Sequence, residues 1–280
     1  MSENIKKSKQ IKKGNKMKGQ KELAFLIHGM NSTKKVFNNY IKYFKTTEYK
    51  ATAFTLPYHD RESNNEVGNI SILVYVEYIR KKVREAGRPV TLIGHSMGGL
   101  IAQMVAALEP DLVKAVVAIT PAPPRWIIAT FPRPVISFSH AIFKTSFWNK
   151  PHKSSFEKAK SSMLHLVEKK EQKRIHNSFL AESGRALFEI GFWPFDLKGT
   201  TGFSAKKVKC PILFIAAKHD RVILPITVLQ NYWKFKLARH EHVFYKKYKN
   251  NAHWIIVEPN WKEVVTDIHN WLRNPTKGPQ

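Results

Sequence analysis

Short apolar runs alternate with amphipathic segments along most of this chain, and a chain with that pattern has few ways to fold. Between the runs, apolar residues recur at spacings of three and four, as they do on one face of a helix. Repeated strand, helix, strand units predict an α/β fold with a mainly parallel sheet of about six strands and helices on both faces. The expected strands are residues 23–29, 51–57, 90–95, 113–120, 211–217 and 242–248.

The alternation stops between Pro121 and Val208, where the pattern is helical and rich in aromatic residues. This stretch separates two expected strands that an ordinary crossover could join. We therefore expect a helical cap inserted over residues 122–207, with the α/β core formed by residues 22–121 and 208–280. Such an insertion would lie at the carboxyl edge of the strands, where open α/β sheets bind ligands.

Positive charge is in large excess, with 47 Lys and Arg against 21 Asp and Glu, a net charge of +26. Part of it is local, since residues 1–21 hold eight lysines and one glutamate and lack apolar periodicity. That composition predicts a disordered basic arm. The excess favours acidic partners such as an acyl carrier protein or an anionic membrane surface. Without interleaved aromatic residues, the arm predicts no specific nucleic-acid binding.

Three features favour a cytoplasmic location. The lysines of the arm run into the first expected strand without the apolar segment that a secretory signal requires. The most apolar long stretch, residues 126–143, is interrupted by Arg133, two prolines and His140, so it is a poor membrane span. Cys210 is the single cysteine and cannot form an internal disulfide, which fits a reducing compartment.

A serine lies between two glycines in Gly94-His95-Ser96-Met97-Gly98. The form G-x-S-x-G is that of a nucleophile elbow, a sharp strand-to-helix turn that exposes the serine oxygen. Alone the pattern has little specificity, but here an apolar run precedes it and an amphipathic segment follows it, as the elbow requires. The alternative is a serine at a glycine-rich helix start with no chemical role.

With this motif the chain resembles the α/β-hydrolase superfamily, in particular its capped esterases, lipases and cofactor-free haloperoxidase relatives. The resemblance covers roughly residues 22–273 and includes an H-G-x loop, His28-Gly29-Met30, after the first expected strand. It implies that the backbone N–H groups of Met30 and Met97 form an oxyanion hole, which would stabilise a tetrahedral intermediate.

The resemblance also implies a base and an acid, in the chain order serine, acid, histidine. Asp220 follows the expected strand 211–217 and matches the acid, and His253 follows the expected strand 242–248 and matches the base. Asp220 could instead only cap the turn before Leu224, and His253 could be structural. The other acid candidates are Glu258 and Asp196. The family often has glycine beside its histidine, whereas this chain has Asn250-Asn251-Ala252.

The sequence contains no residues at metal-ligand spacing, and no nucleotide-binding G-x-G-x-x-G motif follows an expected strand. No cofactor is therefore expected. The cap holds candidates for substrate contact, although aromatic residues there could equally form its own core and arginines a solvated surface. These candidates are Arg125, Trp126, Arg185, Phe188 and Trp193, together with Phe131, Arg133, Phe138, Phe143, Trp148 and Phe192.

The sequence thus predicts a serine hydrolase that cleaves a carboxylic ester through an acyl-enzyme, with a Ser96, His253 and Asp220 triad. A small-molecule or lipid-like ester with a hydrophobic acyl group, free or linked to a carrier protein, is the expected substrate. The alternative is a non-catalytic protein of the same fold that uses its basic surface to hold an acidic protein or nucleic acid.

Overall fold

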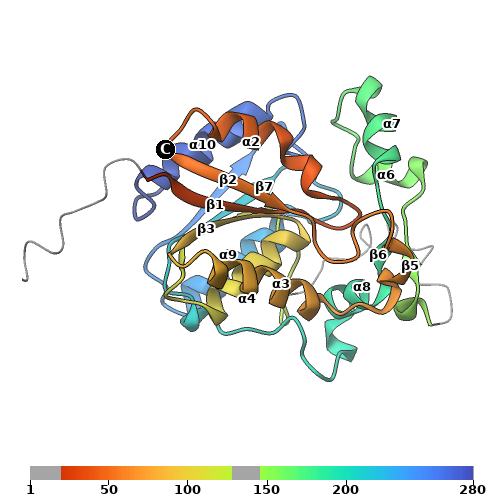
Figure 1. Ribbon diagram of the computed structural model, residues 1–280, viewed down its shortest axis with the longest axis horizontal. Helices are drawn as coiled ribbons and strands as arrows, with labels where there is room; N and C mark the ends of the chain where they lie inside the picture. The colour runs from red at the N-terminus through yellow and green to blue at the C-terminus, as the bar shows by residue number, and fades with distance from the viewer. Residues whose placement is uncertain (1–19, 128–145, 280) are drawn as a thin grey trace, which may run out of the picture.

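A computed structural model of the chain describes residues 20–127 and 146–279. Six parallel strands form one sheet in the order β2-β1-β3-β4-β7-β8 (Figure 1). The predicted α/β fold and the number of strands in its sheet are confirmed. Nearly all of the predicted basic arm lies outside the described residues. The strands are β1 (Glu22–Ile27), β2 (Tyr49–Phe54), β3 (Val90–His95), β4 (Val113–Ile119), β7 (Ile212–Ala217) and β8 (Val243–Tyr248).

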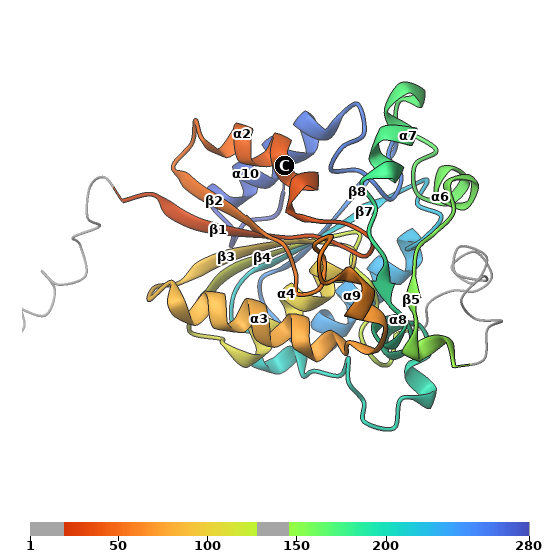
Figure 2. The ribbon, with the colours of Figure 1, turned by 45° about the vertical axis from the view of Figure 1, so that its right-hand side comes forward.

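Helices cover both faces of the sheet, and two apolar cores result (Figure 2). One face packs against α2 (Asn38–Phe44) and α10 (Trp261–Arg273), and the other against α3 (Ile72–Glu85), α4 (Met97–Leu108) and α9 (Pro225–Leu237). Because β3 and β7 are covered on both sides, every residue of these two strands is buried. This explains why their sequences are continuous apolar runs and not alternating ones.

The helix after β2 begins later than its apolar spacing indicates. The spacing starts at Val67, but residues 64–69 form the 3-10 helix η2, and α3 begins at Ile72. Ser71 ends the irregular part because its side chain accepts a hydrogen bond from the N–H of Leu73. A serine in this position satisfies an N–H that has no partner within the helix. A second 3-10 helix, η1 (Lys34–Phe37), precedes α2.

Between β4 and β7, the described residues 146–196 lie beyond the carboxyl ends of the strands, and the chain then returns to the amino ends before β7 (Figures 1 and 2). Its helices are α6 (Phe156–Ser162), α7 (Lys169–Asn177), α8 (Gly184–Gly191) and the 3-10 helices η3 (Phe147–Asn149), η4 (Trp193–Phe195) and η5 (Ala205–Lys207). It also contains a short antiparallel pair, β5 (Pro151–His152) and β6 (Glu182–Ser183), which the helical pattern did not indicate. We call residues 122–207 the insertion.

The strand order reverses direction between β1 and β3. From β1 the chain crosses to β2 at one side, whereas from β3 it continues to β4 at the other. A crevice forms at such a switch point, outside the carboxyl ends of the two strands, and ligands bind there in open α/β sheets. The loop after β1 and the turn after β3 therefore meet where a site is expected. In the described part of the chain, no helix has both the length and the apolar character needed to cross a membrane.

Candidate active site

Ser96 occupies a sharp turn between β3 and α4. Its φ of 54° lies in the left-handed region, where a residue with a side chain is strained. The turn is tight enough that glycine is required on both sides. A Cβ at Gly94 would collide with the carbonyl group of Gly98, and a Cβ at Gly98 with the carbonyl oxygen of Ile27. Strain of this kind persists where the surrounding structure fixes it, commonly at functional sites.

Ser96, His253 and Asp220 form a chain of hydrogen bonds, although more than 120 residues separate the first from the other two. Nε2 of His253 lies 3.1 Å from Oγ of Ser96, at the distance for accepting its hydroxyl proton. Nδ1 of His253 donates to Oδ2 of Asp220 at 2.8 Å. All three side chains are buried. An imidazole held between a carboxylate and a hydroxyl can remove the hydroxyl proton, which makes the oxygen nucleophilic.

Asp220 combines the two roles that its sequence position suggested. Oδ1 accepts hydrogen bonds from the N–H groups of Val222 and Ile223, each at 2.8 Å, so the carboxylate also caps the turn that leads into α9. Oδ2 remains for His253. The alternative acid candidates have other partners: Asp196 accepts from the N–H of Thr200, and Glu258 accepts from the loop before His253.

The loop after β1 lies against Ser96. A Cβ at Gly29 would come within 2.8 Å of the Ser96 Cβ, so only glycine allows the backbone to approach this closely. The next residue is Met30, and Met97 opens α4, where the first N–H groups have no partner within the helix. Both predicted oxyanion residues thus lie beside the serine.

His28 holds this loop in place through both ring nitrogens. Nδ1 donates to the carbonyl oxygen of Gly29 at 2.8 Å, and Nε2 accepts from the N–H of Leu56 at 3.0 Å. This pattern requires a neutral ring with its proton on Nδ1. Burial, followed by the charge of His59, lowers the pKa of His28 to about 3, so the ring stays neutral at physiological pH.

His95, next to the serine, connects β3 to the loop that carries His253. Its Nε2 donates to the backbone carbonyl of His253 at 2.7 Å. Burial is the largest cause that lowers the pKa of His95 to about 3, and the neighbouring His253 adds to the effect. A neutral His95 therefore fixes the backbone of His253 without placing a positive charge beside its ring.

The sequence before His253 departs from the family pattern, and buried polar contacts shape this loop. Oε2 of Glu258 accepts from Nδ2 of Asn251 and from the N–H of Ala252, both at 2.9 Å. Asn251 also exchanges side-chain hydrogen bonds with Asn260 and accepts from the N–H of His219 through its carbonyl oxygen. Asn251 and Glu258 thus hold the loop in shape.

The predicted substrate contacts form two groups in the insertion. In the first, Trp126 and Trp193 pack with ring centroids 5.2 Å apart, and the Arg125 guanidinium lies over Trp126. Trp126 is 72% exposed. In the second, Arg185 pairs with buried Glu189 and lies over Phe188, whose ring stacks on Phe192. Their roles in substrate binding stay predictions. Phe131, Arg133, Phe138 and Phe143 lie outside the described residues.

Other residues join the insertion to the site, and no sequence pattern pointed to them. Asn31 donates from Nδ2 to the carbonyl oxygens of His152 and Leu180. Phe179 stacks on Trp254 at a centroid distance of 5.2 Å, directly after the base. The buried Trp254 indole N–H has no hydrogen-bond partner among the described residues. The segment around Phe179 therefore covers the loops that carry Met30 and His253.

A parallel sheet with a strained serine in the turn after β3, at the switch point, is characteristic of one class of proteins, the α/β hydrolases. Residues 25–259 match the profile of the alpha/beta hydrolase fold family. The chain belongs to this family.

Similar proteins include esterases and lipases. A Mycoplasma pneumoniae protein assigned as a candidate esterase/lipase is 33% identical over 100 residues, which cover 34% of this chain and 36% of that protein. The matched segment thus spans about a third of this relative's length. The structure of a monoacylglycerol lipase from Paleococcus ferrophilus aligns with a TM-score of 0.67 and 20% identity over 90% of this chain and 94% of the lipase. A carboxylesterase structure from Nitrososphaera gargenis aligns with a TM-score of 0.66 and 17% identity over 92% of both chains.

Proposed function

We propose that this protein is a serine hydrolase that cleaves carboxylic esters through an acyl-enzyme. The observation that carries the proposal is the hydrogen-bond chain from Ser96 through His253 to Asp220, at 3.1 Å and 2.8 Å. Such a chain activates a hydroxyl that is otherwise a weak nucleophile. The similarity to esterases and lipases supports ester hydrolysis within the many reactions that this fold accommodates.

The proposed reaction has two stages. In the first, Oγ of Ser96 attacks the ester carbonyl carbon while Nε2 of His253 takes the hydroxyl proton. The carbonyl oxygen gains a negative charge, which the N–H groups of Met30 and Met97 stabilise together with the amino terminus of α4. The intermediate then collapses, the bond to the alcohol breaks, and His253 gives its proton to the leaving oxygen.

In the second stage a water molecule attacks the acyl-enzyme. His253 takes a proton from the water and returns it to Oγ of Ser96 as the acid leaves. Asp220 holds the proton of His253 on Nδ1, which leaves Nε2 facing the serine. The two backbone N–H groups that hold Oδ1 of Asp220 keep the carboxylate in place without taking Oδ2 from the histidine.

We propose a hydrophobic acyl group as the substrate's main recognition element, since the insertion is rich in aromatic residues and places Phe179 against Trp254, directly after His253. The positive charge of the chain suggests two sources of such esters, an anionic membrane surface and an acidic carrier protein. Turnover of a carrier-linked ester that falls with salt, while turnover of a free short-chain ester does not, would identify the carrier.

A fluorophosphonate probe, which reacts covalently with activated serines, tests the proposal. We expect wild type to be labelled and to hydrolyse p-nitrophenyl esters, whereas Ser96→Ala does neither. Ser204→Ala is a matched control, because Ser204 is an exposed serine at the opposite edge of the sheet. Equal labelling of wild type and Ser96→Ala would overturn the proposal in favour of a binding protein. A series of esters of graded acyl length then defines the chain preference.

A further inference from the structure

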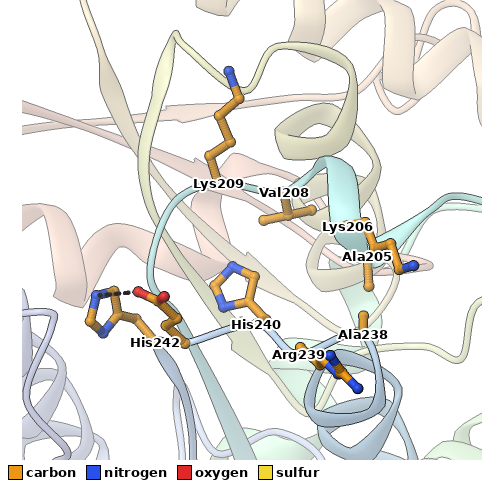
Figure 3. A pocket seen from close by; sticks show the side chains of 9 residues that line it. Ala205, Lys206, Val208, Lys209, Ala238, Arg239, His240 and His242 are labelled. Carbon is orange, nitrogen blue, oxygen red and sulfur yellow. Dashed lines mark ion pairs between the residues drawn. The ribbon is translucent and has the colours of Figure 1, made fainter.

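A concave pocket lies at the edge of the sheet opposite to Ser96. Its volume is about 290 Å3, and two segments that precede neighbouring strands form it, residues 205–209 before β7 and 238–242 before β8 (Figure 3). The amino ends of parallel strands lie opposite to their carboxyl ends, so the pocket is separate from the site at Ser96. Its lining residues are Ala205, Lys206, Val208, Lys209, Ala238, Arg239, His240, Glu241 and His242.

Cationic side chains dominate this pocket. Lys206, Lys209 and Arg239 are joined there by two histidines, and Glu241 is the one carboxylate among the lining residues. Glu241 lies 3.9 Å from Nε2 of His242, and Lys209 pairs with Asp111 outside the pocket at 2.9 Å. Both carboxylates are largely exposed, so solvent screens their effect. The pocket therefore keeps an excess of positive charge in a small concave space.

Arg239 lies where a helix end normally has glycine. The N–H of Arg239 donates to the carbonyl oxygen of Lys236, and the N–H of His240 to that of Phe235. These two bonds define a Schellman motif at the end of α9, and Arg239 has the left-handed φ of 60° that the motif requires. Glycine adopts this conformation without strain, whereas arginine does not. The position thus carries a strained residue whose guanidinium lines the pocket.

His240 is a partly buried residue whose ring nitrogens have unused hydrogen-bonding capacity. Its imidazole lies between the two segments (Figure 3). Both ring nitrogens are enclosed, and neither makes a hydrogen bond of full geometry in the described part of the chain; the backbone of Val208 and Cys210 lies near the ring. Buried polar atoms without partners are rare in folded proteins and commonly indicate a missing water or ion.

We infer that this pocket binds a phosphate group. One guanidinium and two ammonium groups line this small space, which suits the negative charge of phosphate, and arginine binds phosphate oxygens with two parallel hydrogen bonds. The group can be free phosphate or part of an anionic lipid head group. Beside the pocket, α9 presents Trp233 and Leu237, which are 51% and 82% exposed and lie one turn apart. Exposed apolar residues next to cations are typical of membrane-surface helices, which favours the lipid.

Arg239→Gly is the decisive variant, because it removes the guanidinium and also relieves the strained backbone. We expect its melting temperature to equal or exceed that of wild type, so a loss of binding would not reflect unfolding. Lys169→Gln is the matched control, since it removes one exposed cation from α7, far from the pocket in the chain. Lys206→Gln provides a second pocket variant. The basic amino-terminal segment is identical in all four proteins, so its nonspecific contribution to anion binding is the same in each and cancels in the comparison.

Two binding measurements on the full chain, at about 150 mM salt to screen diffuse attraction, distinguish the sources of phosphate. One is equilibrium dialysis against inorganic phosphate, and the other is cosedimentation with phosphatidylcholine vesicles with and without phosphatidic acid. In at least one of them we expect both pocket variants to bind about tenfold more weakly than wild type, with Lys169→Gln unchanged. Weakening in dialysis identifies free phosphate, and weakening only with phosphatidic acid vesicles identifies the lipid. Absence of binding by wild type in both, or equal binding by Arg239→Gly and Lys169→Gln, would overturn the inference.

Discussion

Nδ1 of His28 donates a hydrogen bond to the carbonyl oxygen of Gly29 at 2.8 Å. That carbonyl belongs to the same rigid peptide unit as the N–H of Met30, one of the two proposed oxyanion donors. A bond to one end of a planar peptide fixes the direction of the other end. His28 is therefore a positioning residue for the oxyanion hole, and the N–H of Leu56 holds its ring from the opposite side.

Replacing His28 with phenylalanine should weaken catalysis more than substrate binding. Without the bond to Gly29, the N–H of Met30 is no longer held toward the oxyanion, and we expect kcat to fall by about 10-fold to 100-fold. KM should change by less than about threefold. Steady-state kinetics with a p-nitrophenyl ester measures both. If the variant instead loses activity only in proportion to its loss of folded protein, so that kcat per folded molecule is unchanged, His28 contributes only to stability.

The strands could be predicted within three residues because local patterns determine them. Buried parallel strands need continuous apolar runs, and the elbow needs glycine at Gly94 and Gly98 to avoid a backbone collision. The meeting of Asp220 and His253 beside Ser96 could be predicted because the carboxyl ends of parallel strands share one edge of the sheet; their catalytic roles stay predictions. Their position relative to the strands, and not their neighbours in sequence, carried that signal.

The docking of the insertion could not be predicted in the same way. Asn31 reaches carbonyl groups 121 and 149 residues away, and Phe179 stacks on Trp254. Single polar contacts of this kind leave no periodicity in the sequence. The short β5 and β6 pair was missed for a similar reason, since two strands of two residues each are too short to show alternation. The left-handed helix end at Arg239 was not predicted because glycine is the usual sequence signal for such an end.

Asp220→Asn should reduce kcat by about 10³-fold to 10⁴-fold. The asparagine can still accept the N–H groups of Val222 and Ile223, so the turn should remain folded. Its amide, however, cannot hold the proton of His253 on Nδ1. Asp196→Asn is the control, because this other buried aspartate caps a turn in the insertion and should leave kcat within about twofold. A comparable loss of kcat in both variants would contradict the assignment of Asp220 as the acid of the triad.

Cys210 should react slowly with thiol reagents in the folded protein. Burial raises the pKa of its thiol to about 12, so the reactive thiolate is about one part in ten thousand at pH 8. We expect alkylation by iodoacetamide to be at least about 100-fold slower in the native chain than in concentrated urea. Mass spectrometry of timed samples measures the rates. Similar rates in the two states would contradict the buried environment of this side chain.

His59 and Glu182 join the loop after β2 to strand β6 of the insertion through a fully buried ion pair. Nε2 of His59 donates to Oε2 of Glu182 at 3.0 Å, and Nδ1 donates to the carbonyl oxygen of Pro57. Burial alone would lower the pKa of His59, but the charge and hydrogen bond of Glu182 outweigh it and raise the pKa above the usual value. Both ring nitrogens donate, as only a protonated imidazole can.

This pair should make the stability of the protein depend on pH in a defined direction. A histidine with a raised pKa stabilises the folded state fully below about pH 6.5, its pKa in the unfolded chain, and loses that effect as pH rises through the folded-state value. His59→Gln alone leaves Glu182 buried without its partner and should cost about 3–5 kcal/mol in the free energy of unfolding. His59→Gln/Glu182→Gln should cost less. Urea denaturation between pH 6 and 9 measures each value, and a wild-type slope with pH no steeper than that of the double variant would rule out an ionised pair.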